Sequence, residues 1–323
     1  MERPDILMIA PMQPAVIDAL DEHFTLHRLW LESDKDVFLR DTGPRIRGLA
    51  VSTLAGPIGA DLLARLPALE IVANFGVGYD NVDAADAARR GVVVTNTPGV
   101  LDEEVADLTI GLLLATIRRL PQADRHVREG AWLRGAFPLS PTVRGRRIGI
   151  LGMGGIGRAI ARRLAGFDVG IAYHSRREHP DTGLAYHPTL LGLAEASDVL
   201  IVIVPGTPET QHMVDRPVLA ALGKHGVLIN VARGSVVDQD ALVEALTLGL
   251  IQSAGLDVYA DEPHVPAALI AMPQVVLLPH IGSASVHTRD AMGTLVVDNL
   301  VSWFDGRGAV TPVAESTGLA GAR

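Results

Sequence analysis

The sequence predicts an α/β protein with two doubly wound domains, each built on a parallel sheet. First, short apolar runs alternate with amphipathic helical segments along the whole chain, as parallel strands with crossover helices require. Second, a glycine-rich loop over residues 152–157 directly follows an apolar strand and begins a helix. Third, the length of 323 residues suits roughly two domains of ordinary size.

Four strands are expected in the first part of the chain, each an apolar run that a parallel sheet would bury on both faces. Between them, apolar residues at helical spacing predict helices. The expected strands are residues 6–9, 49–51, 71–73 and 92–94, and the expected helices include residues 14–23 and 60–66.

Six further strands are expected in the second part, which is the size of a full dinucleotide-binding sheet. They are residues 147–151, 169–173, 199–204, 227–230, 253–256 and 275–278.

Helices are also expected around the second part of the chain. A helix with an apolar stripe is expected over residues 102–120, between the two parts. The acidic residues at its start favour a helix N-terminus there. A last helix is expected over residues 286–304. The tail after Val313 is rich in Ala, Gly and Ser, and we predict that it is disordered.

Composition excludes several classes of protein and site. Cysteine is absent, which excludes disulfides, thiolate nucleophiles and cysteine-type zinc sites. The histidines lack the spacing of zinc motifs, so no metal site is predicted.

A formal net charge of −9 argues against nucleic acid as a partner. No apolar run reaches the ~18 residues of a membrane span, and no secretory signal is recognised, so a cytoplasmic location is expected.

The loop over residues 152–157 has the pattern of a dinucleotide-binding fingerprint. Gly152 permits a tight turn, Gly154 lets the backbone approach a pyrophosphate, and Gly157 lets the helix pack on the strand. With Gly155 and Ile156 the loop would place the N-terminus of the helix against the phosphates. The sequence therefore predicts a Rossmann-type nucleotide site.

The end of the next expected strand distinguishes NADP from NAD. An NAD site usually has a carboxylate about 20 residues after the first glycine, where it binds the ribose. This chain instead has Ser175, Arg176 and Arg177 in the turn. A hydroxyl and two guanidinium groups bind a 2′-phosphate that a carboxylate would repel, so we predict NADP(H).

Three further motifs place Arg233, Glu262 and His280 after expected strands in the second part. Reduction of a 2-oxo acid needs these three groups beside a nicotinamide. The arginine binds the substrate carboxylate, the histidine supplies a proton, and the carboxylate raises the pKa of the histidine and orients it.

With these motifs, the chain resembles the D-isomer-specific 2-hydroxyacid dehydrogenases, and the resemblance covers nearly the whole chain up to Val313. The resemblance includes the segments 74–83, 95–99 and 104–108 as well as the motifs above. The turn at residues 173–177 and the stretch at residues 100–108 look most like NADPH-dependent glyoxylate/hydroxypyruvate reductases and hydroxyphenylpyruvate reductases.

The resemblance implies a domain organisation. A flavodoxin-like substrate-binding domain would comprise residues 1–100 and 290–323, with a Rossmann-type NADP-binding domain, residues 101–289, inserted in it. It implies an active site in the cleft between the domains. It also implies a homodimer, joined largely through the nucleotide domain and the helix over residues 102–120.

The resemblance also implies roles for further residues. The backbone of Val77 and Gly78 would bind the substrate carboxylate, and Ser283 would lie near the substrate. Trp132 would project into the partner subunit's cleft, although an ordinary interface tryptophan remains an equal alternative.

On the coenzyme side, Asp257 would hold the nicotinamide carboxamide with Gly282 nearby, and Val204 and Val231 would line the cofactor.

The leading hypothesis is NADPH-dependent reduction of glyoxylate and hydroxypyruvate to D-2-hydroxy acids, with His280 as the general acid. One alternative keeps this chemistry for a bulkier 2-oxo acid, such as hydroxyphenylpyruvate or 2-ketogluconate. Another is a non-catalytic nucleotide-sensing binding protein on the same fold. Turnover of a 2-oxo acid distinguishes the enzyme from the sensor.

Overall fold

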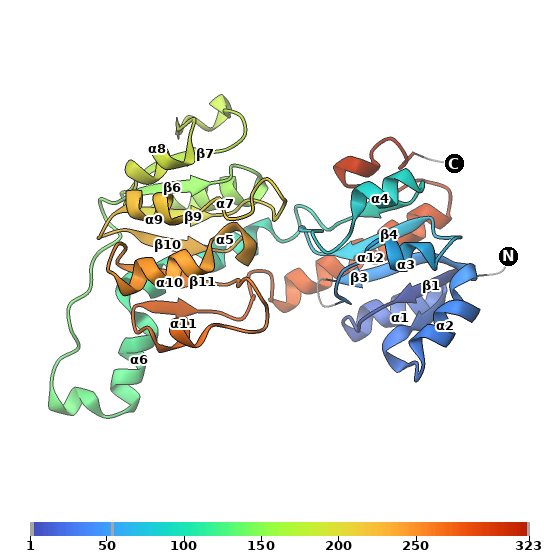
Figure 1. The fold of residues 1–323 in the computed structure, drawn as a ribbon, viewed down its shortest axis with the longest axis horizontal. Coiled ribbons are helices and arrows are strands. Elements are labelled where there is room, and N and C mark those ends of the chain that lie inside the picture. Colours follow the sequence, from blue (N-terminus) through green and yellow to red (C-terminus); the bar gives the residue numbers. More distant parts are fainter. Residues whose placement is uncertain (1–2, 53–54, 322–323) are drawn as a thin grey trace. The chain divides into compact units, whose positions relative to one another are not determined.

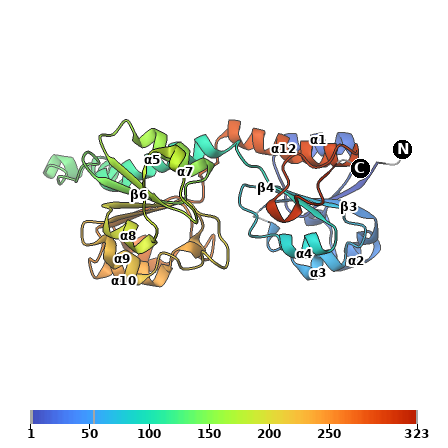
Figure 2. The same ribbon diagram turned by 90° about the horizontal axis from the view of Figure 1, so that it is seen from above.

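The computed structural model describes residues 3–52 and 55–321, and the chain divides into two compact units. Unit 1 comprises Met1–Leu101 and Ser285–Arg323, and unit 2 comprises Asp102–Ala284. Each unit is a parallel sheet with helices on both faces (Figures 1 and 2), so the predicted fold class is confirmed. No helix in the described ranges is long and apolar enough to span a membrane.

Unit 1 has a five-stranded sheet in the order β2-β1-β3-β4-β5. All of its strand pairs are parallel, and this order is that of a flavodoxin-like sheet. The strands are β1 (Asp5–Met8), β2 (Thr25–Arg28), β3 (Ile46–Ser52), β4 (Ile71–Phe75) and β5 (Val93–Thr95).

Helices cover both faces of this sheet because its central strands are apolar on both sides. Figure 2 shows α1 (Pro14–His23) and α12 (Val286–Phe304) on one face. On the other face lie α2 (Lys35–Asp41), α3 (Ala60–Ala64) and α4 (Ala84–Arg89).

Unit 2 has a seven-stranded parallel sheet in the order β12-β11-β10-β9-β6-β7-β8. The order reverses between β6 and β9, which is where doubly wound sheets bind their ligands. The strands are β6 (Arg147–Leu151), β7 (Gly170–His174), β8 (Ala185–Tyr186), β9 (Val199–Val202), β10 (Val227–Asn230), β11 (Ser253–Leu256) and β12 (Val275–Leu277).

Two buried apolar clusters lie on the two faces of this sheet. On one face are α5 (Asp102–Arg118) and α7 (Gly155–Leu164), and on the other are α8 (Leu190–Glu195), α9 (Arg216–Leu222) and α10 (Gln239–Thr247) (Figure 2). The remaining helices of the unit are α6 (Leu120–Arg128) and α11 (Ala267–Ala271).

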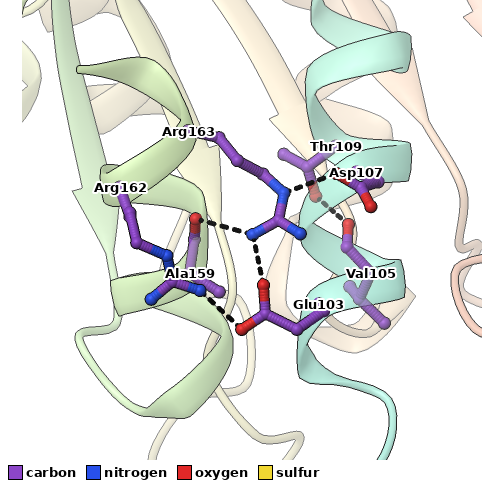
Figure 3. Close-up of polar contacts among 7 residues, drawn as sticks. All are labelled: Glu103, Val105, Asp107, Thr109, Ala159, Arg162 and Arg163. Carbon is purple, nitrogen blue, oxygen red and sulfur yellow. Dashed lines mark hydrogen bonds and ion pairs between the residues drawn. The ribbon is translucent and has the colours of Figure 1, made fainter. Parts of the chain in front are cut away.

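The helices α5 and α7 are joined by charged side chains as well as by their apolar faces (Figure 3). The Arg163 guanidinium binds the Asp107 carboxylate at 2.5 Å and Glu103 Oε2 at 2.7 Å. Arg162 binds the second oxygen of Glu103. These contacts hold the last turn of α7, the helix that follows the glycine loop, against the first turns of α5.

Several elements begin and end where the sequence predicts, including helices 14–23 and 286–304 and strands 147–151, 227–230 and 253–256. The expected helix over residues 102–120 instead ends at Arg118, because Arg119 adopts a left-handed φ of 55° and α6 begins after it. The sequence analysis missed β2 and β8. Both are short edge strands, which lack the continuous apolar run of a buried strand.

The predicted disorder after Val313 is wrong for the described part of the tail. Val313 is buried in the core of unit 1. A 3-10 turn (Ala314–Ser316) follows, in which Ser316 is fully buried and its hydroxyl accepts the Val94 N–H at 2.9 Å. The composition of the tail could not show that β5 provides it with a partner.

Candidate active site

The predicted site residues of unit 2 follow successive strands at one edge of the sheet. They are His280 after β12, Asp257 after β11, Arg233 after β10, Val204 after β9, Gly152 after β6 and Ser175 after β7. Because the strands are parallel, their carboxyl ends meet at this edge, where ligands bind in such sheets. Residues spread over more than a hundred positions are thereby collected on one edge of a rigid sheet.

The glycine loop has the geometry that a dinucleotide requires. Gly152 has a φ of +108°, and a β-carbon there would collide with the Ile203 carbonyl. A β-carbon on Gly157 would collide with the Gly152 carbonyl. These two glycines therefore allow the turn and the close packing of α7 on β6.

The two glycines between them, Gly154 and Gly155, have different surroundings. Apart from the chain neighbours of Gly154, no atom of the described residues lies within 4 Å of the position of a β-carbon there, so the backbone is open to a ligand at the start of α7. A β-carbon on Gly155 would collide with the Asp102 carboxylate. Ile156 is half-buried and packs on the apolar cluster beneath the helix.

The turn after β7 fits a coenzyme with a 2′-phosphate. Arg176 and Arg177 are exposed, and neither makes an ion pair with another described residue. The Ser175 hydroxyl donates to the Arg177 carbonyl at 2.6 Å, which keeps the turn compact. The residues present therefore fit NADP(H) better than NAD(H).

His280 and Glu262 form the central pair of the site. His280 Nδ1 lies 2.7 Å from Glu262 Oε2, and Glu262 Oε1 accepts the Tyr259 N–H at 3.0 Å. Burial acts to raise the pKa of Glu262, but the hydrogen bonds from His280 and Tyr259 and the charges of His280 and Arg233 outweigh it and lower that pKa. Glu262 is therefore ionised at neutral pH, and His280 Nε2 remains as the nitrogen that can act on a substrate.

Asp257 holds the backbone next to His280. Its buried carboxylate accepts the N–H groups of Ile281 and Gly282, both at 2.8 Å. His280 has a left-handed φ of 54°, which is uncommon for a residue other than glycine. Burial raises the pKa of Asp257, although these two N–H groups act against the rise. The sequence analysis did not foresee this contact with the backbone.

Tyr259 is another positioning residue, and the sequence analysis did not name it. Its buried hydroxyl donates to the Leu278 carbonyl at 2.9 Å, which ties the end of β11 to the segment before His280. Burial, with a contribution from the Asp257 charge, raises the pKa of Tyr259 to about 12, so the hydroxyl stays a donor. Its place in the segment between Asp257 and Glu262 was the only signal in the sequence.

Arg233 extends from a turn that Asn230 shapes. The Asn230 amide donates to the Arg233 carbonyl and accepts the Ala232 N–H, each at 3.1 Å. Gly234 lies so close to the backbone of Tyr259 that a β-carbon would collide with it. This contact brings the turn after β10 against the segment after β11, and the Arg233 charge lowers the pKa of Glu262.

The remaining predicted residues of unit 2 lie along the same edge. Val231 is buried at the end of β10, and Val204 is half-buried beside Gly152. Gly282 is buried on Asp257, and Ser283 follows it, half-buried.

In unit 1, Val77 and Gly78 lie in a loop held by two asparagines that the sequence analysis did not single out. The Asn96 amide donates to the Val77 carbonyl at 2.8 Å, and the Asn74 amide donates to the Gly78 carbonyl at 3.0 Å. The N–H groups of Val77 and Gly78 have no acceptor among the described residues. The loop can therefore donate two backbone hydrogen bonds to an anion.

Comparisons with known proteins agree with this geometry. Residues 110–282 match the NAD binding domain of the D-isomer specific 2-hydroxyacid dehydrogenases. The chain is 47% identical to glyoxylate/hydroxypyruvate reductase A of Arabidopsis thaliana, covering 97% of this chain and 100% of that protein. It is 46% identical to the hydroxyphenylpyruvate reductase of Plectranthus scutellarioides, with the same two coverages.

A solved structure is also similar over the full chain. It is the NADPH-dependent glyoxylate/hydroxypyruvate reductase of Sinorhizobium meliloti in complex with NADP and malonate, with 54% identity and a TM-score of 0.92. The match covers 100% of this chain and 99% of that one.

Proposed function

The chain belongs to the D-isomer specific 2-hydroxyacid dehydrogenase family, and on that premise we propose that it reduces glyoxylate and hydroxypyruvate to D-2-hydroxy acids with NADPH. The observation that carries the proposal is the His280–Glu262 pair at 2.7 Å, on the same sheet edge as Arg233 and a coenzyme turn with two arginines. The enzyme is thus an NADP-dependent oxidoreductase of the glyoxylate/hydroxypyruvate reductase type.

Arg233 is the proposed group for substrate binding. Its guanidinium pairs with the substrate carboxylate and polarises the keto oxygen, and a fork of N–H donors suits both tasks. In unit 1, the N–H groups of Val77 and Gly78 are the proposed donors to a substrate carboxylate, and in unit 2 Ser283 is the further proposed substrate-binding residue. Asp257 and Gly282 would hold the nicotinamide end of the site, with Val204 and Val231 along the coenzyme.

His280 is the proposed general acid. NADPH, when bound, supplies the hydride that reduces the keto carbon. The keto oxygen then needs one proton, which His280 donates from Nε2, because Nδ1 is held by Glu262. Ionised Glu262 stabilises the protonated imidazole before the transfer and fixes the direction of the ring.

The two units take different roles in this proposal. Unit 2 is the NADP-binding domain, expected over residues 101–289, and unit 1 is the substrate-binding domain, expected over residues 1–100 and 290–323. We also propose a homodimer in the cytoplasm. Exposed apolar side chains on and after α6 support the dimer, and these are Leu120, Val127, Trp132, Leu133 and Leu139.

The test is a set of initial rates for NADPH and NADH oxidation with four 2-oxo acids: glyoxylate, hydroxypyruvate, hydroxyphenylpyruvate and 2-ketogluconate. We expect the highest kcat/KM with NADPH and the two small acids. Absence of turnover with every acid, despite measurable coenzyme binding, would contradict the enzyme and favour a nucleotide sensor.

A second candidate is the same reaction on hydroxyphenylpyruvate. The near-equal identity to a hydroxyphenylpyruvate reductase, 46% against 47%, favours this alternative over other bulky acids. The same rates decide between the two, because a preference for the aromatic acid would keep the proposed roles of Arg233 and His280 and change only the substrate.

A further inference from the structure

We propose that Arg158 is a positioning residue for coenzyme choice, acting on residues 174–183, here called the coenzyme loop. By pairing with Asp181 it holds this loop so that Arg176 and Arg177 present their charges to the 2′-phosphate. The inference rests on the proposed use of NADPH and assigns a role to a residue that lies outside the glycine fingerprint and outside the Ser-Arg-Arg turn.

Arg158 reaches the coenzyme loop from the first turns of α7. Its Nη1 lies 2.5 Å from Asp181 Oδ2 and its Nη2 lies 3.2 Å from Asp181 Oδ1. The same Nη2 donates to His179 Nδ1 at 3.1 Å. A bidentate pair with a third contact fixes an orientation as well as a distance, so the far side of the loop is tied to the helix that begins at the pyrophosphate site.

Two tyrosines hold the other parts of the loop. The hydroxyl of buried Tyr173 accepts the His179 N–H at 2.6 Å. The Tyr186 hydroxyl donates to the Ser175 carbonyl at 3.2 Å. The loop is therefore fastened before Arg176 and after Arg177, while both guanidinium groups remain exposed.

The charges give Arg158 a second effect on the same loop. The loop contains two arginines, and also Glu178 and Asp181, so its own formal charge cancels when the histidines are neutral. The hydrogen bond from Arg158 lowers the pKa of Asp181, which keeps that carboxylate ionised and paired. Because Arg158 neutralises the Asp181 carboxylate, the rest of the loop has a net positive charge, which attracts a 2′-phosphate.

The prediction concerns coenzyme affinity, which is measured without turnover. In Arg158→Met, we expect the Kd of NADPH to rise about fivefold, the effect of an exposed but bidentate ion pair. The Kd of NADH, which has no 2′-phosphate, should stay within about twofold. Titration of nucleotide fluorescence gives both constants. A variant that weakens both coenzymes equally would show a general structural role and overturn the proposal.

A charge swap separates positioning from direct contact. The double variant Arg158→Asp with Asp181→Arg keeps the pair and the net charge but moves the cation from position 158 to position 181. We expect it to regain most of the affinity for NADPH. If Arg158 itself bound the phosphate, the swap would remain as weak as Arg158→Met, and the positioning role would be wrong.

Tyr173→Phe tests the same role with no change of charge, in case the swapped pair does not fold. Hydrogen exchange of the coenzyme-free protein should be faster at the His179 amide, and NADPH should bind more weakly while NADH does not. Unchanged exchange and unchanged affinity would contradict a fastened loop. The matched control is Glu244→Gln, which breaks the exposed Arg216–Glu244 pair of unit 2 and should leave both Kd values unchanged.

The wild-type protein distinguishes failure of this inference from failure of the proposed function. If it binds NADPH no better than NADH, the coenzyme assignment is wrong and the inference falls with it. If it prefers NADPH and Arg158→Met keeps that preference, only the positioning role is wrong.

Discussion

The two units differ in how their polar groups are paired at the carboxyl ends of their strands. In unit 2, Glu262 binds His280 and the Tyr259 N–H, and Asp257 accepts two further N–H groups. In unit 1, several buried side-chain oxygens have no hydrogen-bond partner among the described residues, including those of Ser52, Asn74 and Thr97. Because unpaired buried polar atoms are rare, each needs an explanation.

This difference in pairing indicates that the two units have different roles in the proposed reaction. Groups that are fully paired are held in one geometry before the substrate arrives, which suits the proton transfer assigned to unit 2. Polar groups left without a partner can bind a ligand or water, which suits the substrate binding assigned to unit 1. Changes in unit 2 should therefore act mainly on kcat, and changes in unit 1 mainly on KM.

The largest effect is expected for His280→Asn in unit 2. The variant removes the proposed general acid, a contribution worth roughly 10²- to 10⁴-fold in rate. We expect kcat for glyoxylate to fall about 10³-fold while the Kd of NADPH hardly changes. Steady-state rates and a coenzyme titration measure the two quantities. Wild-type turnover in this variant would refute the mechanism.

Glu262→Gln should have the next largest effect. The neutral amide no longer stabilises protonated His280, so we expect reduction at neutral pH to slow by about tenfold, the equivalent of about 1.4 kcal/mol. Steady-state rates with glyoxylate at pH 7 test this, and an unchanged kcat in Glu262→Gln would contradict the role of Glu262.

The His280–Glu262 pair also predicts the direction in which the free energy of unfolding changes with pH. The folded pKa of Glu262 lies below its ordinary value of 4.5, so its contribution is present above that value and is lost as the pH falls through the lower folded pKa. Unfolding free energies should therefore show the wild type losing stability relative to Glu262→Gln only in that acidic range. A relative loss between pH 5 and 7 would show that the pair is arranged differently in solution.

Most of unit 2 was predictable because its chemistry follows apolar strands. Asp257 directly follows such a strand, and Arg233 and His280 each stand three residues after one, so the parallel sheet places all three at the same edge. The contacts of Asp257 with Ile281 and Gly282 were not predictable, since they depend on the path of the backbone after β12. Sequence patterns indicate which side chains reach the edge but not which backbone atoms they meet.

Unit 1 was harder to predict for the same reason. Its loop at Val77 and Gly78 is shaped by side chain–backbone hydrogen bonds from Asn74 and Asn96, and neither asparagine has a spacing that identifies it. Ser316 was missed because its partner, Val94, lies more than two hundred residues earlier. Such long-range pairs leave no local signal in the sequence.

The smallest effect, and the sharpest test of the comparison, is expected for Asn96→Ala in unit 1. The variant removes the hydrogen bond to the Val77 carbonyl, and a bond of this kind is worth about 1 kcal/mol. The loop would then present its N–H groups less well, so the KM for glyoxylate should rise about fivefold with kcat nearly unchanged. Steady-state kinetics give both values.

A matched variant in unit 2 completes this comparison. Asn230→Ala also removes hydrogen bonds that an asparagine makes to its own turn, here beside Arg233. Because Arg233 also polarises the keto oxygen, this change should lower kcat as well as raise KM. If Asn96→Ala lowered kcat to the same extent as Asn230→Ala, the loop of unit 1 would take part in the chemical step. The unpaired oxygens near that loop would then need an explanation other than substrate binding.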